Sequence, residues 1–180
     1  MPIKILIPQT ELYDEENNMF YDIKEQHLTL EHSLVSLQKW EQKWKVPFLD
    51  PRVEKTVEMM RDYIRCMTVT QNVDPDAYMA IPPDEWKRIN EYISDPMTAT
   101  TIRSTGKKSR EIVTAEIIYY WMIKCNIPPE YRKWHLNSLL MLIEVCGVKE
   151  SPEKKMSQKE LADYHRRVNA ANRAKFHSKG

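Results

Sequence analysis

The first part of the chain, residues 1–31, has the hydrophobic spacing of β-strands. Every second residue from Ile3 to Ile7 is apolar, and segments 19–23 and 26–30 also have the composition of extended chain. Asp, Glu and Asn fill residues 14–18, which is typical of a turn. We predict an antiparallel β-meander over 1–31, which must pack against another layer to be stable.

Helical spacing follows over residues 32–148. Ser33 is suited to cap a first helix whose apolar residues, up to Trp44, recur every three or four positions. The pair Asp50-Pro51 combines a cap acceptor with proline in the first turn, and it predicts the start of a second helix.

The rest of this part contains one short helix and two strongly apolar ones. The short helix is expected over 84–94, and Met97–Ile102 is predicted to be a strand. Segment 110–125 is apolar on most sides, so we expect it at the centre of the fold. Segment 134–146 is its predicted partner, and Gly147 is suited to a left-handed C-terminal cap. These patterns predict an α+β fold: a mainly helical body of about five helices, with an N-terminal antiparallel β-meander and a basic C-terminal helix.

Charge changes sign where this body ends. The 180 residues have a net charge of only +1, but residues 1–148 carry 18 Lys and Arg against 22 Asp and Glu, whereas residues 149–180 carry 9 against 4. We predict a globular body over 1–148. A linker and a basic helix, opened by the capping-box pattern Ser157–Glu160, are predicted over 149–180. Such a helix can bind phosphates, dock in an acidic groove of a partner, or fold back on the acidic body.

Two sets of residues are candidates for partner binding. Flexible Met side chains adapt to varied apolar surfaces, so those of the second helix are suited to cover apolar segments of a partner. Basic residues of the last helix add attraction to acidic surfaces, with apolar anchors beside them. The candidates are Met59, Met60 and Met67 in the second helix, Arg166, Arg167, Arg173 and Lys175 as basic residues, and Leu161, Tyr164 and Val168 as anchors.

Motifs that resemble catalytic or ligand sites have simpler explanations. Thr105–Ser109 lacks the first glycine of a phosphate-binding loop and is better explained as a basic loop before a helix cap. His27 and His32 have no third ligand nearby, so no metal site is expected. Three widely spaced cysteines in apolar segments indicate structural thiols, although Arg65 could lower the pKa of the Cys66 thiol. We predict no catalytic residue, no cofactor and no metal, so the protein is not expected to be an enzyme.

Aromatic residues at helical spacing are expected to serve packing. Trp40 and Trp44, one turn apart, are predicted to lie in the core rather than to stack on bases. Trp134 is expected to anchor the helix that it opens, with His135 and Asn137 facing solvent. No apolar run approaches the ~18 residues of a membrane span, and the N-terminus does not fit a secretory signal. With an odd number of cysteines, these features predict a soluble protein of a reduced cytosol.

Several segments resemble, in order and spacing, a family of small proteins encoded by tailed bacteriophages and prophages, many from Gram-positive hosts. The matching segments run through most of the chain. They are Leu30–Leu37, Lys39–Glu41, Lys43–Trp44, Asp62–Thr70, Asp95–Thr100, Ser109–Ile112, Glu116–Met122, Lys133–Asn137 and Lys154–Ser157.

The resemblance implies a non-enzymatic role in assembling a siphophage tail. Such genes lie near those of the major tail protein and the tape-measure protein, and their products are often described as tail assembly chaperones. The expected partners are tape-measure or tail-tube proteins, and the expected location is the host cytoplasm or the virion; a homo-oligomer is left open, and no membrane is involved. Two alternatives are a structural virion component, such as a head–tail connector or minor tail protein, and a phage nucleic-acid-binding protein that uses the basic C-terminal helix.

Overall fold

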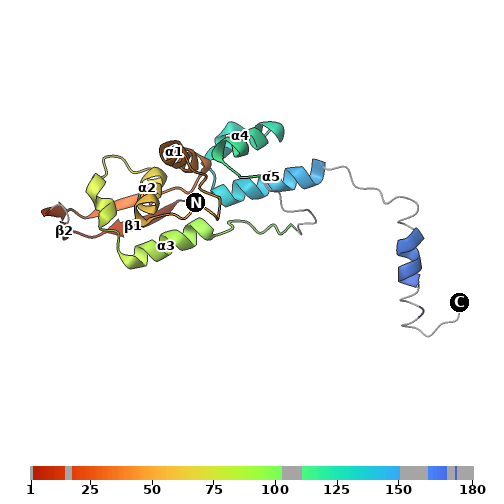
Figure 1. The fold of residues 1–180 in the computed structure, drawn as a ribbon, viewed down its shortest axis with the longest axis horizontal. Helices are drawn as coiled ribbons and strands as arrows, with labels where there is room; N and C mark the ends of the chain where they lie inside the picture. Colours follow the sequence, from red (N-terminus) through yellow and green to blue (C-terminus); the bar gives the residue numbers. More distant parts are fainter. Residues whose placement is uncertain (1, 15–17, 103–110, 151–161, 170–172, 174–180) are drawn as a thin grey trace. The chain divides into compact units, whose positions relative to one another are not determined.

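The fold is α+β with a mainly helical body, as the sequence predicts. The computed structural model describes residues 2–14, 18–102, 111–150, 162–169 and 173. The chain divides into two compact units, Met1–Val148 and Lys149–Gly180. Figure 1 shows the helices and strands of the first unit and the short helix, residues 162–169, of the second.

The N-terminal strands form one long antiparallel ribbon in two parts. β1 pairs with β4, and β2 pairs with β3. The register continues across the break, because Ile7 lies opposite Gln26 and Thr10 lies opposite Ile23. Pro8, which has no N–H to donate, lies at the break. The strands are β1 (Ile3–Ile7), β2 (Thr10–Asp14), β3 (Met19–Ile23) and β4 (Gln26–Leu30). The antiparallel strands are confirmed, but the first pairs with the last, which is the order of a hairpin and not of the predicted meander.

Residues from later in the chain cover both edges of the β1–β4 part. The N–H of Leu6 donates to a carboxylate oxygen of Glu85 (3.3 Å), and Arg88 donates to the carbonyl oxygen of Lys4 (3.2 Å). On the other edge, the N–H of Val69 donates to the carbonyl oxygen of Thr29 (2.9 Å). This part of the ribbon is therefore closed to further strands.

The aromatic centre of the core lies between α1 (Leu34–Trp44) and α2 (Val57–Met67), which pack together. Ser33 caps α1, as predicted. Trp40 is fully buried and donates through Nε1 to the carbonyl oxygen of Met59 (2.8 Å). Phe48 stacks on Tyr63 with ring centroids 3.9 Å apart.

α2 begins later than the pair Asp50-Pro51 predicts. The Asp50 carboxylate accepts from the backbone N–H of Arg52 (2.9 Å) and pairs with the Arg52 guanidinium (2.8 Å), so it closes a local turn. Thr56 caps the helix instead, and its hydroxyl accepts from the N–H of Met59 (3.2 Å). The predicted start is wrong because an Asp side chain that bonds its own backbone two residues on favours a turn over a helix.

The short helix predicted over 84–94 is confirmed as α3 (Pro83–Ser94), which follows the 3₁₀ helix η1 (Pro75–Met79). It buries Ile89 and Tyr92. The strand predicted over Met97–Ile102 is wrong. Met97 has a φ of 48°, in the left-handed region, which a strand cannot contain.

The two strongly apolar helices lie at an edge of the body, which corrects the expected central position of the first. α4 (Ala115–Lys124) lies beside α1 and buries only Ala115, Ile118 and Met122. It begins after Thr114, and not at residue 110. The 3₁₀ helix η2 (Pro129–Lys133) leads to α5 (Leu136–Glu150). Gly147 is helical, so its predicted role as a left-handed cap is wrong.

One buried carboxylate connects α1, the following loop and α4. Glu41 accepts from the N–H of Phe48 (2.8 Å) and from the N–H of Ala115 (2.7 Å). Thr114, the N-cap of α4, makes no side-chain cap bond, so Glu41 satisfies the helix end in its place. Burial raises the pKa of Glu41, while the two N–H donors lower it.

We predict that Glu41→Ala lowers the free energy of unfolding by roughly 2–4 kcal/mol, because two buried N–H groups lose their acceptor. Urea denaturation measures the change. Glu91→Ala, at an exposed position of α3, is the matched control and should change stability by less than about 0.5 kcal/mol. Equal effects of the two substitutions would contradict the connecting role of Glu41.

Candidate functional site

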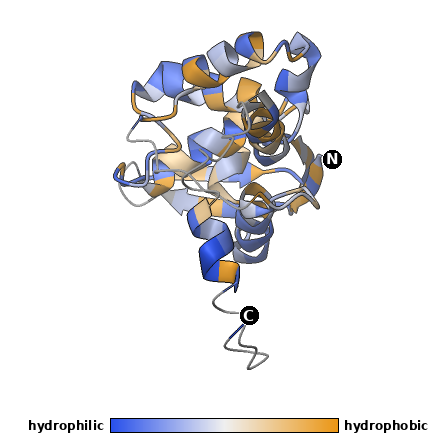
Figure 2. Cartoon of the chain, turned by 90° about the vertical axis from the view of Figure 1, so that its right-hand side faces the viewer, coloured by the Kyte–Doolittle hydropathy of each residue, from blue (hydrophilic) through white to orange (hydrophobic). Residues whose placement is uncertain are grey.

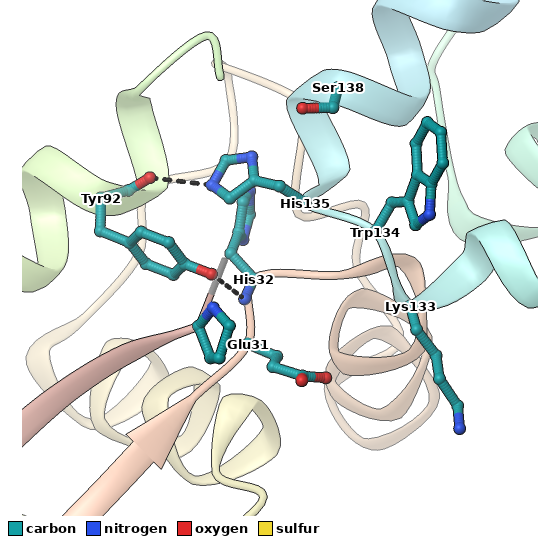
Figure 3. A pocket seen from close by; sticks show the side chains of 8 residues that line it. Glu31, His32, Tyr92, Lys133, Trp134, His135 and Ser138 are labelled. Atoms are coloured by element: carbon teal, nitrogen blue, oxygen red, sulfur yellow. Dashed lines mark hydrogen bonds between the residues drawn. The ribbon is translucent and has the colours of Figure 1, made fainter. Parts of the chain in front are cut away.

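Two histidines meet where the β-ribbon leads into α1 and where α5 begins (Figure 3). The rings of His32 and His135 lie 5.0 Å apart and nearly edge to face. The N–H of Leu136 donates to the carbonyl oxygen of His32 (2.8 Å), which joins the two segments through the backbone. Both side chains are buried, so the expectation that His135 faces solvent is wrong. Asn137 also turns inward, and its amide donates to the carbonyl oxygen of Ile93 (2.9 Å).

Two tyrosines complete this histidine cluster. The Tyr63 hydroxyl lies 2.6 Å from Nδ1 of His32, and the Tyr92 hydroxyl accepts from the N–H of His32 (3.3 Å). Nε2 of His135 lies 3.0 Å from the carbonyl oxygen of Tyr92. A carbonyl only accepts, so Nε2 carries the proton and Nδ1 of His135 is a bare acceptor. That Nδ1 has no hydrogen-bond partner in the described part of the chain.

The cluster keeps its imidazoles neutral. Burial, with a smaller contribution from His135, lowers the pKa of His32 to about 3. Burial also lowers the pKa of His135. A cavity of about 310 Å³ beside the cluster is lined by Glu31, Lys133, Trp134 and Ser138, among others. Ser138 donates its proton to the carbonyl oxygen of Met97 (2.8 Å), so it is not paired with either imidazole as a nucleophile would be.

The other candidates for chemistry are separate from this cluster. His27 is 77% exposed and lies 3.7 Å from Glu25, whereas His32 is buried. No group of three or more metal-ligating side chains occurs among residues 2–14, 18–102, 111–150, 162–169 and 173. Burial raises the pKa of Cys66 to about 11, so Arg65 does not make it a thiolate at neutral pH. The histidine cluster connects the β-ribbon, α1, α3 and α5 through these hydrogen bonds.

A second hollow is an apolar groove between the start of α4, the loop before α2 and α5. Its volume is about 620 Å³. The Asp50–Arg52 ion pair lies in its wall, and Ile112 is 42% exposed within it. We call this the α4–α5 groove. It is lined by Leu49, Asp50, Pro51, Arg52, Glu111, Ile112, Val113, Trp121 and Leu140.

The helices that border the groove keep much of their apolar surface open. Figure 2 shows hydrophobic residues on the outer ribbons of the body as well as in its interior. In α5, Leu136 and Leu139 are buried. The apolar residues that follow are only half-buried, and they are Leu140, Met141, Leu142, Ile143, Val145 and Cys146. A helix that is apolar on all sides is normally enclosed by protein. The described part of the chain only partly covers these residues of α5, so the helix keeps apolar surface open.

The prediction that methionines of α2 form an exposed binding surface is wrong for two of the three residues. Met59 is 9% and Met67 is 1% exposed, so both belong to the core and are not free to bind a partner. Met60 is half-buried in a hollow that also contains Val57 and Trp86. The sequence pattern misplaced Met59 because the buried face of α2 also includes Asp62 and Tyr63, and it is therefore turned toward Met59 and away from Val57.

The candidate residues of the second unit are largely exposed where the structure describes them. Tyr164, Arg166, Arg167 and Arg173 are exposed, and Val168 is half-buried. Arg166 pairs with Asp163 (3.6 Å) on the same helix. Leu161 and Lys175 lie outside the described residues.

Comparisons with protein-family models, with curated proteins and with solved structures found no match. In the described residues, no helix is both long and apolar enough to cross a membrane.

We predict that stability falls below pH 6.5 because of His32. The unfolded chain binds a proton at its ordinary pKa, whereas folded His32 does so only near pH 3. Above pH 6.5 the imidazole is neutral in both states, and by pH 5 the loss reaches roughly 2 kcal/mol.

Urea denaturation at pH 7.5 and pH 5 tests this prediction. His32→Gln should reduce the difference between the two pH values, whereas His27→Gln, at an exposed position, should leave it unchanged. If His32→Gln and the wild type lose the same stability between these pH values, His32 is not the group responsible.

Proposed function

We propose that this protein is a non-enzymatic assembly factor that binds apolar segments of a partner protein during the assembly of a siphophage tail. The observation that carries the proposal is the open α4–α5 groove, bordered by half-buried apolar residues of α5. The resemblance to phage tail proteins makes the tape-measure protein the expected partner.

The groove fits an amphipathic helix better than a small polar ligand. Leu49, Ile112, Trp121 and Leu140 give it apolar walls, and the charges of Asp50 and Arg52 neutralise each other at its side. An amphipathic helix binds such a groove with its apolar face and leaves its polar face in water. A long apolar tape-measure helix offers many segments of this kind, so low sequence selectivity suits the task.

The basic second unit supplies a different interaction. Arg166, Arg167 and Arg173 are exposed on it and attract acidic surfaces over several ångströms. Charge of this kind increases the rate of association more than the final affinity. The groove is thus proposed to bind the partner, and the basic helix is proposed to increase the rate at which the partner associates.

We predict that Ile112→Asp weakens binding of the tape-measure protein about tenfold or more, because it places a charge in the apolar groove. Co-expression and co-purification of the two proteins, followed by titration of the purified pair, measure the change. Val57→Asp is the matched control, because Val57 is 62% exposed at the first position of α2, outside the groove. Equal binding by both variants would contradict the proposed groove.

We predict that deletion of residues 157–180 lowers the association rate for the same partner and leaves the thermal unfolding of the body unchanged, because the body is a compact unit of its own. Surface plasmon resonance at two salt concentrations measures the rate. An unchanged rate would contradict the steering role. Loss of DNA binding, in place of partner binding, would support the nucleic-acid alternative.

A further inference from the structure

We propose that the outer face of α4 is the interface of a homodimer, in which two copies of the helix pair antiparallel about a twofold axis. The face consists of Glu116, Tyr120, Ile123 and Lys124, which are all exposed. This inference does not depend on the proposed function, because the α4–α5 groove lies on a different flank of the helix.

The position of this dimer face follows from the helical period. Ala115, Ile118 and Met122 point into the body, so Tyr120 lies on the opposite side of α4. Trp121 lines the groove on one flank, and the hydroxyl of Tyr119 donates to Gln38 of α1 (3.1 Å) on the other. One flank therefore borders the groove and the other contacts α1, and the dimer face is the side that remains.

The exposure of this face is unusual for its composition. Tyr120 is 61% and Ile123 is 79% exposed, although they follow each other at helical spacing. Single exposed apolar residues are ordinary, but an aromatic and a β-branched residue side by side at the edge of a body form a patch. Figure 1 shows α4 at that edge of the body.

The charges of the dimer face are complementary to a second copy of the same face. Glu116 lies one turn before Tyr120 and Lys124 lies one turn after it. A twofold axis near Tyr120 therefore brings Glu116 of each copy toward Lys124 of the other, and the two apolar pairs meet between them. Such a contact is isologous and closes on itself at two copies. The antiparallel arrangement also places the negative end of each helix dipole beside the positive end of the other.

The charges of the dimer face therefore fit a second copy of the same chain. A parallel pair would set Glu116 against Glu116 and Lys124 against Lys124, which is unfavourable. A single ten-residue helix covers less area than a standard interface, so the dimer is expected to be weak and dependent on concentration. Each dimer would carry two grooves, and two linked sites raise the avidity for a long partner.

Charge reversal tests the arrangement. Glu116→Lys gives a chain with Lys at both ends of the dimer face, and Lys124→Glu gives a chain with Glu at both ends. Each variant alone should dimerise about tenfold or more weakly than the wild type, because two attractive pairs become repulsive. An equimolar mixture should dimerise again, since every pair in the mixed dimer is opposite in sign. Sedimentation velocity over a range of concentrations measures all three.

Two controls separate the dimer from changes in folding. Glu91→Lys makes the same charge change at an exposed position of α3 and should leave dimerisation unchanged. Ile123→Asp should abolish the dimer while circular dichroism and thermal unfolding stay near those of the wild type. A wild-type protein that stays monomeric at all concentrations would overturn the proposal. Failure of the mixture to dimerise would overturn the antiparallel arrangement. Neither result depends on tape-measure binding, so the test of the dimer can fail while the test of the groove succeeds, and the reverse.

Discussion

The buried carboxylate of Glu41 is the contact on which the rest of the body depends. It lies on α1, and it accepts one N–H from the loop before α2 and one from the first turn of α4. A carboxylate taken out of water is stable only where donors replace the lost hydration, and here two backbone N–H groups do so. The same bonds stop those N–H groups from being buried without an acceptor. The position of α4 is thereby set by its N-terminal end and by one buried face.

This attachment explains why so much apolar surface stays open. α4 buries the three residues that face α1 and the core, and the remaining sides border the groove or form the dimer face. α5 is attached in a similar way at its own first turn, where Leu136 bonds to the backbone of His32 and His135 packs against Tyr92. Beyond Leu139 its apolar residues are only half-covered. Both helices are thus attached to the body through their first turns, and their later apolar residues are only partly covered. Such a surface is suited to bind another helix.

The polar groups of the interior also connect elements that are distant in the sequence. His32 and His135 are neutral, the Tyr63 hydroxyl bonds to Nδ1 of His32, and the Ser138 hydroxyl beside them bonds to a backbone carbonyl. Asp62 accepts from Lys43 and from Nε1 of Trp44 (2.9 Å), which holds α2 to α1. These contacts join elements that are distant in the sequence. Binding through apolar surface, which is the proposed function, needs a frame of this kind because the binding face itself contributes little to the stability of the free protein.

Local pattern was enough for β1, β3 and β4, for the Ser33 cap of α1, for α3 and for the α+β class, since each depends on near neighbours and on the period of apolar residues. It failed at Asp50, where a turn competes with a helix cap, and at Met59 and Met67, which lie on the same buried face as Asp62 and Tyr63. The apolar composition of α4 and α5 was also plain from the sequence, but not their place at an edge. That place is decided by bonds between residues far apart, Glu41 with Ala115 and His32 with Leu136. The sequence by itself determined which segments avoid water; only the tertiary structure decided which of them are enclosed, because enclosure depends on contacts that no local period contains.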